Sequence, residues 1–197
     1  MSILEVNTIN PQSGNDVTIG GSSKNVKFAS GTTVDFSTNT PTLTLGVAMK
    51  NTPAFEARLS SDQTISDDTL TKISVNEEVF DTDNCYDNSS NYRFTPTVAG
   101  KYFVYWVVCG QANSANAYNS NGFIYFNGSQ YNGANIVPNG NSSGGSTTAI
   151  AIIDFNGSSD YVEFYLKVDA ISGTVKADHD FSGGNTTYAG AYRLIGA

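Results

Sequence analysis

Charged residues are scarce in this sequence, and basic residues are the scarcest. Asp, Glu, Lys and Arg make up 14% of the 197 residues, against roughly 25% in an ordinary globular protein. The 10 basic residues are scattered among 18 acidic ones, and the net charge is −8. Binding to nucleic-acid phosphates, or to an anionic membrane surface, needs clustered Lys and Arg. We therefore expect no nucleic-acid partner and no electrostatic attachment to membranes.

Long apolar runs and cysteines are scarce as well. No stretch approaches the ~20 apolar residues of a membrane-spanning helix, so we expect no membrane insertion. The N-terminal residues MSILEV lack the basic and apolar regions of a secretory signal, and we expect synthesis in a cytoplasm without secretion by that route. The two cysteines, Cys85 and Cys109, have no CxxC spacing. Cys109 ends an apolar strand-like run, so a small buried thiol fits it better than a disulfide or a nucleophile.

The sequence also has little that would support catalysis or metal binding. Its one histidine, His179, lies in the polar segment KADHDFSGG, and no nucleophile motif such as G-x-S-x-G accompanies it. The segment DTDNCYDNSSN alternates oxygen ligands, but it lacks the Gly and Glu of an EF-hand calcium loop. We predict no enzymatic activity, no cofactor and no metal site, and leave open whether Asp81 to Asp87 hold a calcium ion.

Gly, Asn, Ser and Thr are abundant instead, and 12% of the residues are aromatic. No apolar period of 3.6 residues is present, whereas β-branched and aromatic residues alternate between clusters of Gly, Asn, Asp and Ser. This pattern predicts an all-β protein, and eight to ten strands suit a two-sheet jelly roll. We expect strands at 54–59, 69–75, 78–80, 92–95, 101–109, 123–126, 147–155, 161–168 and 188–195, and long loops at 110–122, 127–146 and 169–185.

Four short repeats precede these strands. Each places two apolar residues around one polar residue, as in Val17-Thr18-Ile19. Such strands are too short to build a core in one chain, so we expect residues 1–48 to form a β stem or anchor that packs against other chains. The head is then residues 53–197. The stem residues expected to pack are Val17, Ile19, Val26, Phe28, Val34, Phe36, Leu43 and Leu45.

The expected strand 101–109, KYFVYWVVC, is apolar on both faces. A half-exposed antiparallel strand should alternate apolar and polar residues. The segment AIAII, residues 149–153, has the same two-sided character. Either the chain's own loops cover the second face or a neighbouring subunit does. We favour subunits packed around an axis, with Phe103, Tyr105 and Val107 in the packing.

The segment from Val79 to Val108 resembles the signature of C1q/TNF-like trimeric jelly rolls. It contains a YD pair, an N-x-x-F strand and a G-x-Y turn before the long apolar strand. PAFEARLS, IYFNGSQ and YAGAYRLIGA are similar to the first, hairpin and closing strands of that family. The resemblance covers residues 53–197 and implies a homotrimeric jelly-roll head. The collagen-like stalk of animal members is missing.

The N-terminal MSILEVNTINPQSGNDVTIGG resembles segments of structural proteins in tailed bacteriophages, especially phages of cyanobacteria and other marine bacteria. This resemblance implies a virion protein, either a trimeric capsid decoration (cement) protein or a short fibre, anchored by its stem to capsid or tail proteins. Which of the two locations applies is left open. A C1q-like lectin unrelated to phages is a weaker hypothesis because of the stem.

The alternative within the same resemblance is a tail-fibre adhesin that recognises host-surface glycans or proteins. Aromatic faces among amide groups suit weak carbohydrate recognition. Tyr118 and Tyr131 stand among Asn and Gly residues in two of the expected loops. They are therefore the candidate receptor-contact residues.

Overall fold

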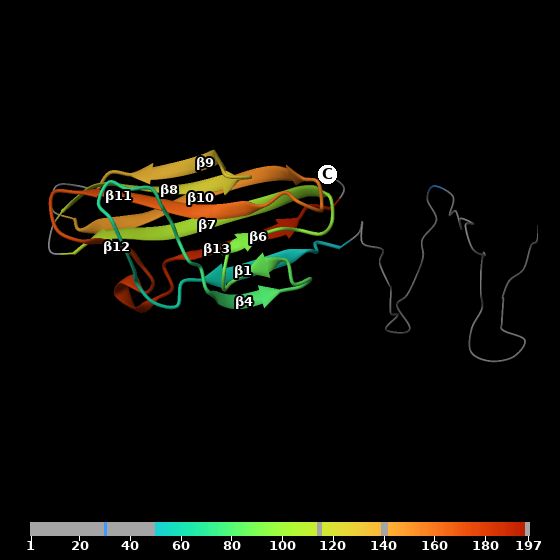
Figure 1. The fold of residues 1–197 in the computed structure, drawn as a ribbon, viewed down its shortest axis with the longest axis horizontal. Coiled ribbons are helices and arrows are strands. Elements are labelled where there is room, and N and C mark those ends of the chain that lie inside the picture. The colour runs from blue at the N-terminus through green and yellow to red at the C-terminus, as the bar shows by residue number, and fades with distance from the viewer. Residues whose placement is uncertain (1–29, 31–49, 114–115, 139–141, 196–197) are drawn as a thin grey trace, which may run out of the picture. The chain divides into compact units, whose positions relative to one another are not determined.

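The computed structural model describes residue 30 and residues 50–113, 116–138 and 142–195. The expected stem residues from Val17 to Leu45 lie outside this part of the chain. The described residues form two antiparallel sheets that pack face to face (Figure 1). The predicted all-β jelly-roll class is confirmed, and the described residues contain one short 3-10 helix, η2 (Phe181–Gly183), and no α-helix.

The first sheet, sheet A, has the order β2-β12-β7-β13-β1-β4, and β10 pairs with the other side of β7. Its strands are β1 (Ala54–Arg58), β2 (Gln63–Ile65), β4 (Glu77–Asp81), β7 (Gly100–Ala112), β10 (Gly144–Phe155), β12 (Val175–Asp178) and β13 (Tyr188–Arg193). Sheet B has the order β5-β6-β11-β8-β9, and β3 also pairs with β11. Its strands are β3 (Thr71–Lys72), β5 (Tyr86–Asp87), β6 (Arg93–Phe94), β8 (Ala117–Phe126), β9 (Ser129–Ile136) and β11 (Val162–Ala170).

The core lies between the two sheets and follows the alternation of β7. Tyr102, Val104, Trp106 and Val108 point inward and are fully buried. The Trp106 ring lies 5.3 Å from the ring of Phe164 in β11. Its indole N–H donates a hydrogen bond of 3.0 Å to the Tyr165 carbonyl. Trp106 therefore joins sheet A to sheet B by both packing and a hydrogen bond.

The motif residues before β7 form an aromatic layer at one end of the core. Phe55 stacks on Tyr86 and on Phe94, at centroid distances of 4.4 and 4.7 Å. The Tyr86 hydroxyl donates to the Val75 carbonyl at 2.7 Å. Burial raises the pKa of Tyr86, so this phenol keeps its proton. The YD pair and the N-x-x-F strand thus have a packing role.

Strands occupy parts of all three segments that the sequence predicts as loops. The first half of β8, all of β9 and all of β12 fall in them, and the short strands β2 and β5 were not expected. These segments are rich in Asn, Gly and Ser, which have low strand propensity. Pairing with a neighbouring strand holds them in the sheet, as when β9 follows β8 from Phe126 back to Ser120.

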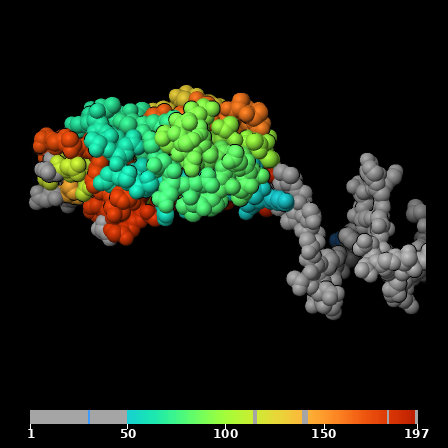
Figure 2. All heavy atoms as spheres, turned by 60° about the horizontal axis from the view of Figure 1, so that its bottom comes forward, coloured from blue at the N-terminus to red at the C-terminus, as the bar shows by residue number. Residues whose placement is uncertain are grey.

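The start of β1 and the end of β13 lie at the same end of the sandwich (Figure 1). The Arg193 N–H donates to the Asn51 carbonyl at 3.1 Å, and Ala54 pairs with Tyr192. Figure 2 shows a face on which the segment from β1 to β6, coloured teal to green, covers much of the surface. Among the described residues, no helix has the length and apolar character needed to cross a membrane.

Candidate assembly surface

The outer face of sheet A carries a continuous row of apolar side chains. Residues directly opposite each other on paired strands share a face. Ile152 lies opposite Phe103 and Ile150 opposite Tyr105, while Tyr192 lies opposite Phe103 on the other side. We define the assembly face as Phe80, Phe103, Tyr105, Val107, Ile150, Ile152, Tyr188 and Tyr192.

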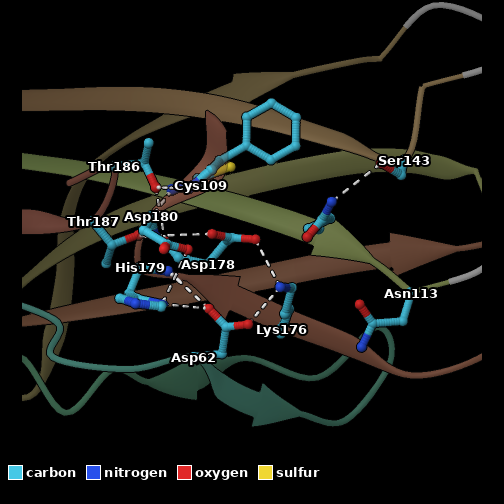
Figure 3. Close-up of polar contacts among 12 residues, drawn as sticks. Asp62, Cys109, Asn113, Ser143, Lys176, Asp178, His179, Asp180, Thr186 and Thr187 are labelled. Atoms are coloured by element: carbon cyan, nitrogen blue, oxygen red, sulfur yellow. Dashed lines mark hydrogen bonds and ion pairs between the residues drawn. The ribbon is translucent and has the colours of Figure 1, made fainter. Parts of the chain in front are cut away.

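The chain covers its own outer face at one end of β7. Cys109 is buried, because the segment from Asp178 to Thr187 lies over it (Figure 3). The Cys109 N–H donates to the Thr187 hydroxyl at 3.1 Å, and that hydroxyl donates to the Asp178 carbonyl at 2.6 Å. Burial raises the pKa of the Cys109 thiol. Cys109 is thus a buried thiol, as predicted, and here the covering segment belongs to the same chain.

Nothing in the described part of the chain covers the rest of this face. Ile150 and Ile152 are 52% and 57% exposed, and Phe80 and Tyr192 are 44% and 39% exposed. Scattered exposed apolar residues are ordinary, but a contiguous apolar patch marks an interaction surface. Apolar side chains therefore lie on both faces of β7 and of residues 149–153, and the packing of Phe103, Tyr105 and Val107 against a neighbouring subunit stays a prediction.

Sequence reasoning identified the β7 members of this face and missed those on β4 and β13. The segment YAGAY puts Tyr188 and Tyr192 four residues apart around Gly190, which places both on one face of a strand. That spacing could have placed both tyrosines on the assembly face from the sequence alone. No spacing in the sequence places Phe80 on this face, because a bulge between Glu56 and Ala57 shifts the register of β4 against β1.

A polar pair lies within the assembly face. The Tyr105 hydroxyl donates to the Glu56 carboxylate at 2.6 Å. Burial and this hydrogen bond raise the pKa of Tyr105, so the phenol remains a donor at neutral pH. Arg58 and Glu77 form an ion pair of 2.6 Å on the β1–β4 side. An apolar centre with charged groups beside it is the usual anatomy of a protein interface.

A second group of ionisable side chains lies at the opposite end of sheet A. Asp62, Asp178, His179 and Asp180 bring their ligand atoms within 4.8 Å of one another. Lys176 already lies between two of the carboxylates, with ion pairs to Asp62 and Asp178 (Figure 3). Because this ammonium supplies the positive charge, the group is a structural ion-pair cluster that joins β12 to the residue before β2.

The protonation states of this cluster follow from its hydrogen bonds. His179 Nδ1 lies 2.8 Å from the Asp62 carboxylate, and this hydrogen bond raises the pKa of His179. Desolvation raises the pKa of Asp62, but the hydrogen bonds from His179 and Lys176 outweigh it and lower that pKa to about 2. Asp62 is therefore ionised across the physiological range.

The segment from Asp81 to Asp87 uses its carboxylates within the turn. Asp81 accepts from the Tyr86 N–H at 2.7 Å. Asp87 accepts from the N–H groups of Ser90 and Ser89 at 2.9 and 3.0 Å, and these bonds hold its pKa well below the usual range. Carboxylates engaged in this way fit a hydrogen-bonded turn.

The two candidate receptor-contact tyrosines lie on strands and not in loops. Tyr118 is in β8 and Tyr131 in β9, and both side chains are exposed. The Tyr131 hydroxyl donates to the Ile152 carbonyl at 3.0 Å. The sequence missed this placement because the surrounding Asn and Gly residues are typical of turns. A role in receptor contact stays a prediction.

No protein-family model and no curated protein matches the chain. Several solved structures do match the chain in their fold. Murine APRIL has a TM-score of 0.50 at 12% identity and covers 72% of this chain and 98% of its own. Eiger TNF from S. frugiperda has a TM-score of 0.51 at 11% identity, over 73% and 92% of the two chains. Vertex protein P5 of phage PRD1 has a TM-score of 0.50 at 15% identity, and the match covers 74% of this chain and 99% of the P5 chain. The chain therefore has a TNF-like jelly-roll fold.

Proposed function

We propose that the chain is a non-enzymatic structural protein of a tailed-phage virion that assembles as a homotrimer through its assembly face. The observation that supports assembly best is the pair of isoleucines on β10, which are more than half exposed beside the aromatic side chains of β7 and β13. Burying an isoleucine side chain contributes roughly 1.5–3 kcal/mol. The resemblance of residues 53–197 to C1q/TNF-like trimeric jelly rolls favours three subunits over two.

The virion setting is supported by two independent likenesses. The N-terminal VNTI-x-P-x-SG segment resembles stems of tailed-phage structural proteins. The fold resembles a phage vertex protein. In this proposal residues 1–48 anchor the trimer to capsid or tail proteins, and residues 53–197 form the projecting head. The protein acts as a capsid decoration protein or as a short fibre.

Assembly is tested by Ile152→Glu, with Ile171→Glu as the matched control. Both isoleucines are exposed to a similar extent, 57% and 55%, but Ile171 lies after β11 and away from the assembly face. Light scattering coupled to size exclusion should give the wild type and Ile171→Glu about three times the 20.9 kDa chain mass. Ile152→Glu should give a folded monomer, since it places a charge in the interface.

A wild type that is monomeric at micromolar concentration would refute the trimer. Ile152→Glu is a sharper test than Tyr105→Asp. Tyr105 bonds to Glu56 within one chain, so an aspartate there would also put two carboxylates together in the monomer.

Location in the particle is a separate question. Gold-labelled antibodies on intact virions should mark either many evenly spaced capsid sites or the tail. Even labelling of the capsid supports a decoration protein, whereas labelling confined to fibre tips supports an adhesin.

A further inference from the structure

A shallow groove of about 340 Å³ runs over β8 and β9, on the sheet opposite the assembly face. Asn121 and Phe123 alternate with the fully buried Ile124 along β8, so they point to the outer side of sheet B. Asn135 lies opposite Asn121 in the ladder and shares that side. The groove is therefore separate from the surface that the trimer would bury between its sheets A.

The β9 strand that carries the groove is held from its other side. Asn132 lies opposite the fully buried Ile124 in the ladder, so its side chain points away from the groove and toward sheet A. Tyr131 is fixed by its bond to the Ile152 carbonyl. The Asn132 amide donates to the Ile150 carbonyl, and its oxygen accepts from the Gly133 N–H at 2.8 Å. These bonds tie β9 to β10, so the strand that carries the groove is fixed before a ligand binds, which reduces the entropic cost of binding.

The remaining amides in the groove have hydrogen-bonding capacity to spare. The side chains of Gln130 and Asn135 have no hydrogen-bond partner among the described residues. Asn121 donates to the Asn119 side chain at 2.6 Å, which leaves its own oxygen as an acceptor. Each amide offers two donors and one acceptor site with two lone pairs. Such groups match hydroxyls, which both donate and accept.

Aromatic surface and glycine give the groove its shape. A Cβ atom at Gly133 would lie 2.6 Å from Phe123 Cδ1, so the Phe123 ring extends over the glycine. Aromatic faces combined with amide donors provide amphipathic contact to the apolar and hydroxyl faces of a sugar.

The lining contains no Asp, Glu, Lys or Arg, although the chain carries a net charge of −8. A phosphate, sulfate or carboxylate ligand would need a cationic partner there, and a basic ligand would need an acidic one. We propose that this groove binds a neutral saccharide unit of a surface glycan. The site is independent of the assembly proposed above, and either can fail without the other.

The test uses the full chain and saturation-transfer NMR with named probes. These are neutral oligosaccharides of glucose, galactose, mannose and N-acetylglucosamine, and a uronic-acid oligosaccharide as the charged comparator. At least one neutral oligosaccharide should receive saturation. Gln130→Ala combined with Asn135→Ala should weaken its binding roughly 3- to 10-fold or more, as expected for lost hydrogen bonds.

Asn185→Ala is the matched control, because Asn185 is also an exposed asparagine and lies outside the groove. Its binding should equal that of the wild type. Three results would overturn the proposal: no neutral oligosaccharide binds the folded protein, only the uronic-acid probe binds, or binding is unchanged in the double variant. Circular dichroism of the double variant checks that its strands remain intact, so lost binding is assigned to the groove.

Discussion

At the scale of single residues, Trp106 links the two sheets by both packing and a hydrogen bond. It is fully buried, it packs on Phe164, and its N–H satisfies the Tyr165 carbonyl. Removing such a ring leaves a cavity and an unpaired buried carbonyl.

We expect Trp106→Ala to lower the free energy of unfolding by ~3–5 kcal/mol. Urea denaturation followed by circular dichroism at fixed protein concentration measures this. Val137→Ala is the control, since Val137 is 71% exposed and should change stability by only about 0.5 kcal/mol. Equal effects of the two substitutions would show that Trp106 is not a core residue.

His179 gives the fold a pH dependence. The hydrogen bond to Asp62 raises the folded-state pKa of His179 above its ordinary value of 6.5, and the charges of Asp180 and Asp178 raise it further. Lys176 faces the same group, with ion pairs to Asp62 and Asp178. A raised pKa means that the charged imidazole stabilises the fold fully below pH 6.5. That contribution is lost as the pH rises through the raised value.

His179→Gln should therefore lower the melting temperature more at pH 5.5 than at pH 8.5. Asp62 stays ionised at both values because its pKa is lowered to about 2. Differential scanning fluorimetry of both proteins in matched ionic strength gives the comparison. A loss that is equal at the two pH values, or larger at pH 8.5, would contradict the ion pair.

At the scale of elements, the contact between β7 and β13 depends on a missing side chain. A Cβ atom at Gly190 would lie 2.2 Å from the Tyr105 hydroxyl. The Tyr105 ring thus lies across the glycine and reaches Glu56. Gly184, by contrast, has extended backbone and open space around it.

Gly190→Ala should displace Tyr105, break its bond to Glu56 and cost ~1–3 kcal/mol of stability, as overpacking does. Gly184→Ala should be neutral or slightly stabilising. Chemical denaturation of the two variants side by side measures the difference. Equal stability of Gly190→Ala and Gly184→Ala would contradict the close packing of the Tyr105 ring on Gly190 of β13.

The elements also show what the sequence can and cannot predict. The β7 strand was predictable because β-branched and aromatic residues fill both of its faces. The β9 strand, SQYNGANI, was not, because it is almost wholly exposed and contains residues typical of turns. Its pairing partner β8 holds it, and a long-range pairing leaves no local pattern. For the same reason, part of the assembly face was predictable and the groove on β8 and β9 was missed.

At the scale of the whole molecule, the core cluster of the described residues is drawn from Phe55 to Ala191. These residues come from strands along the whole head, so the head contains a hydrophobic core of its own. The head should therefore fold without the stem.

We expect a fragment of residues 50–197 to show the β-type circular dichroism of the full chain and a single cooperative unfolding transition. It keeps Asn51, whose carbonyl accepts from Arg193. Light scattering on the fragment separates the roles of the two parts. A folded trimer assigns assembly to the head, a folded monomer assigns it to the stem, and an unfolded fragment contradicts the proposed boundary at 48–53.

The position of β1 has a mechanical consequence. It lies between β13 and β4 and is paired with both, and it is the first described strand after residue 50. Tension that pulls on the chain along the β1 axis is resisted in shear, because antiparallel hydrogen bonds run perpendicular to the strands. Both ladders must then yield together and not one bond at a time. A protein tethered through its N-terminal segment would resist detachment of its head most strongly in that direction.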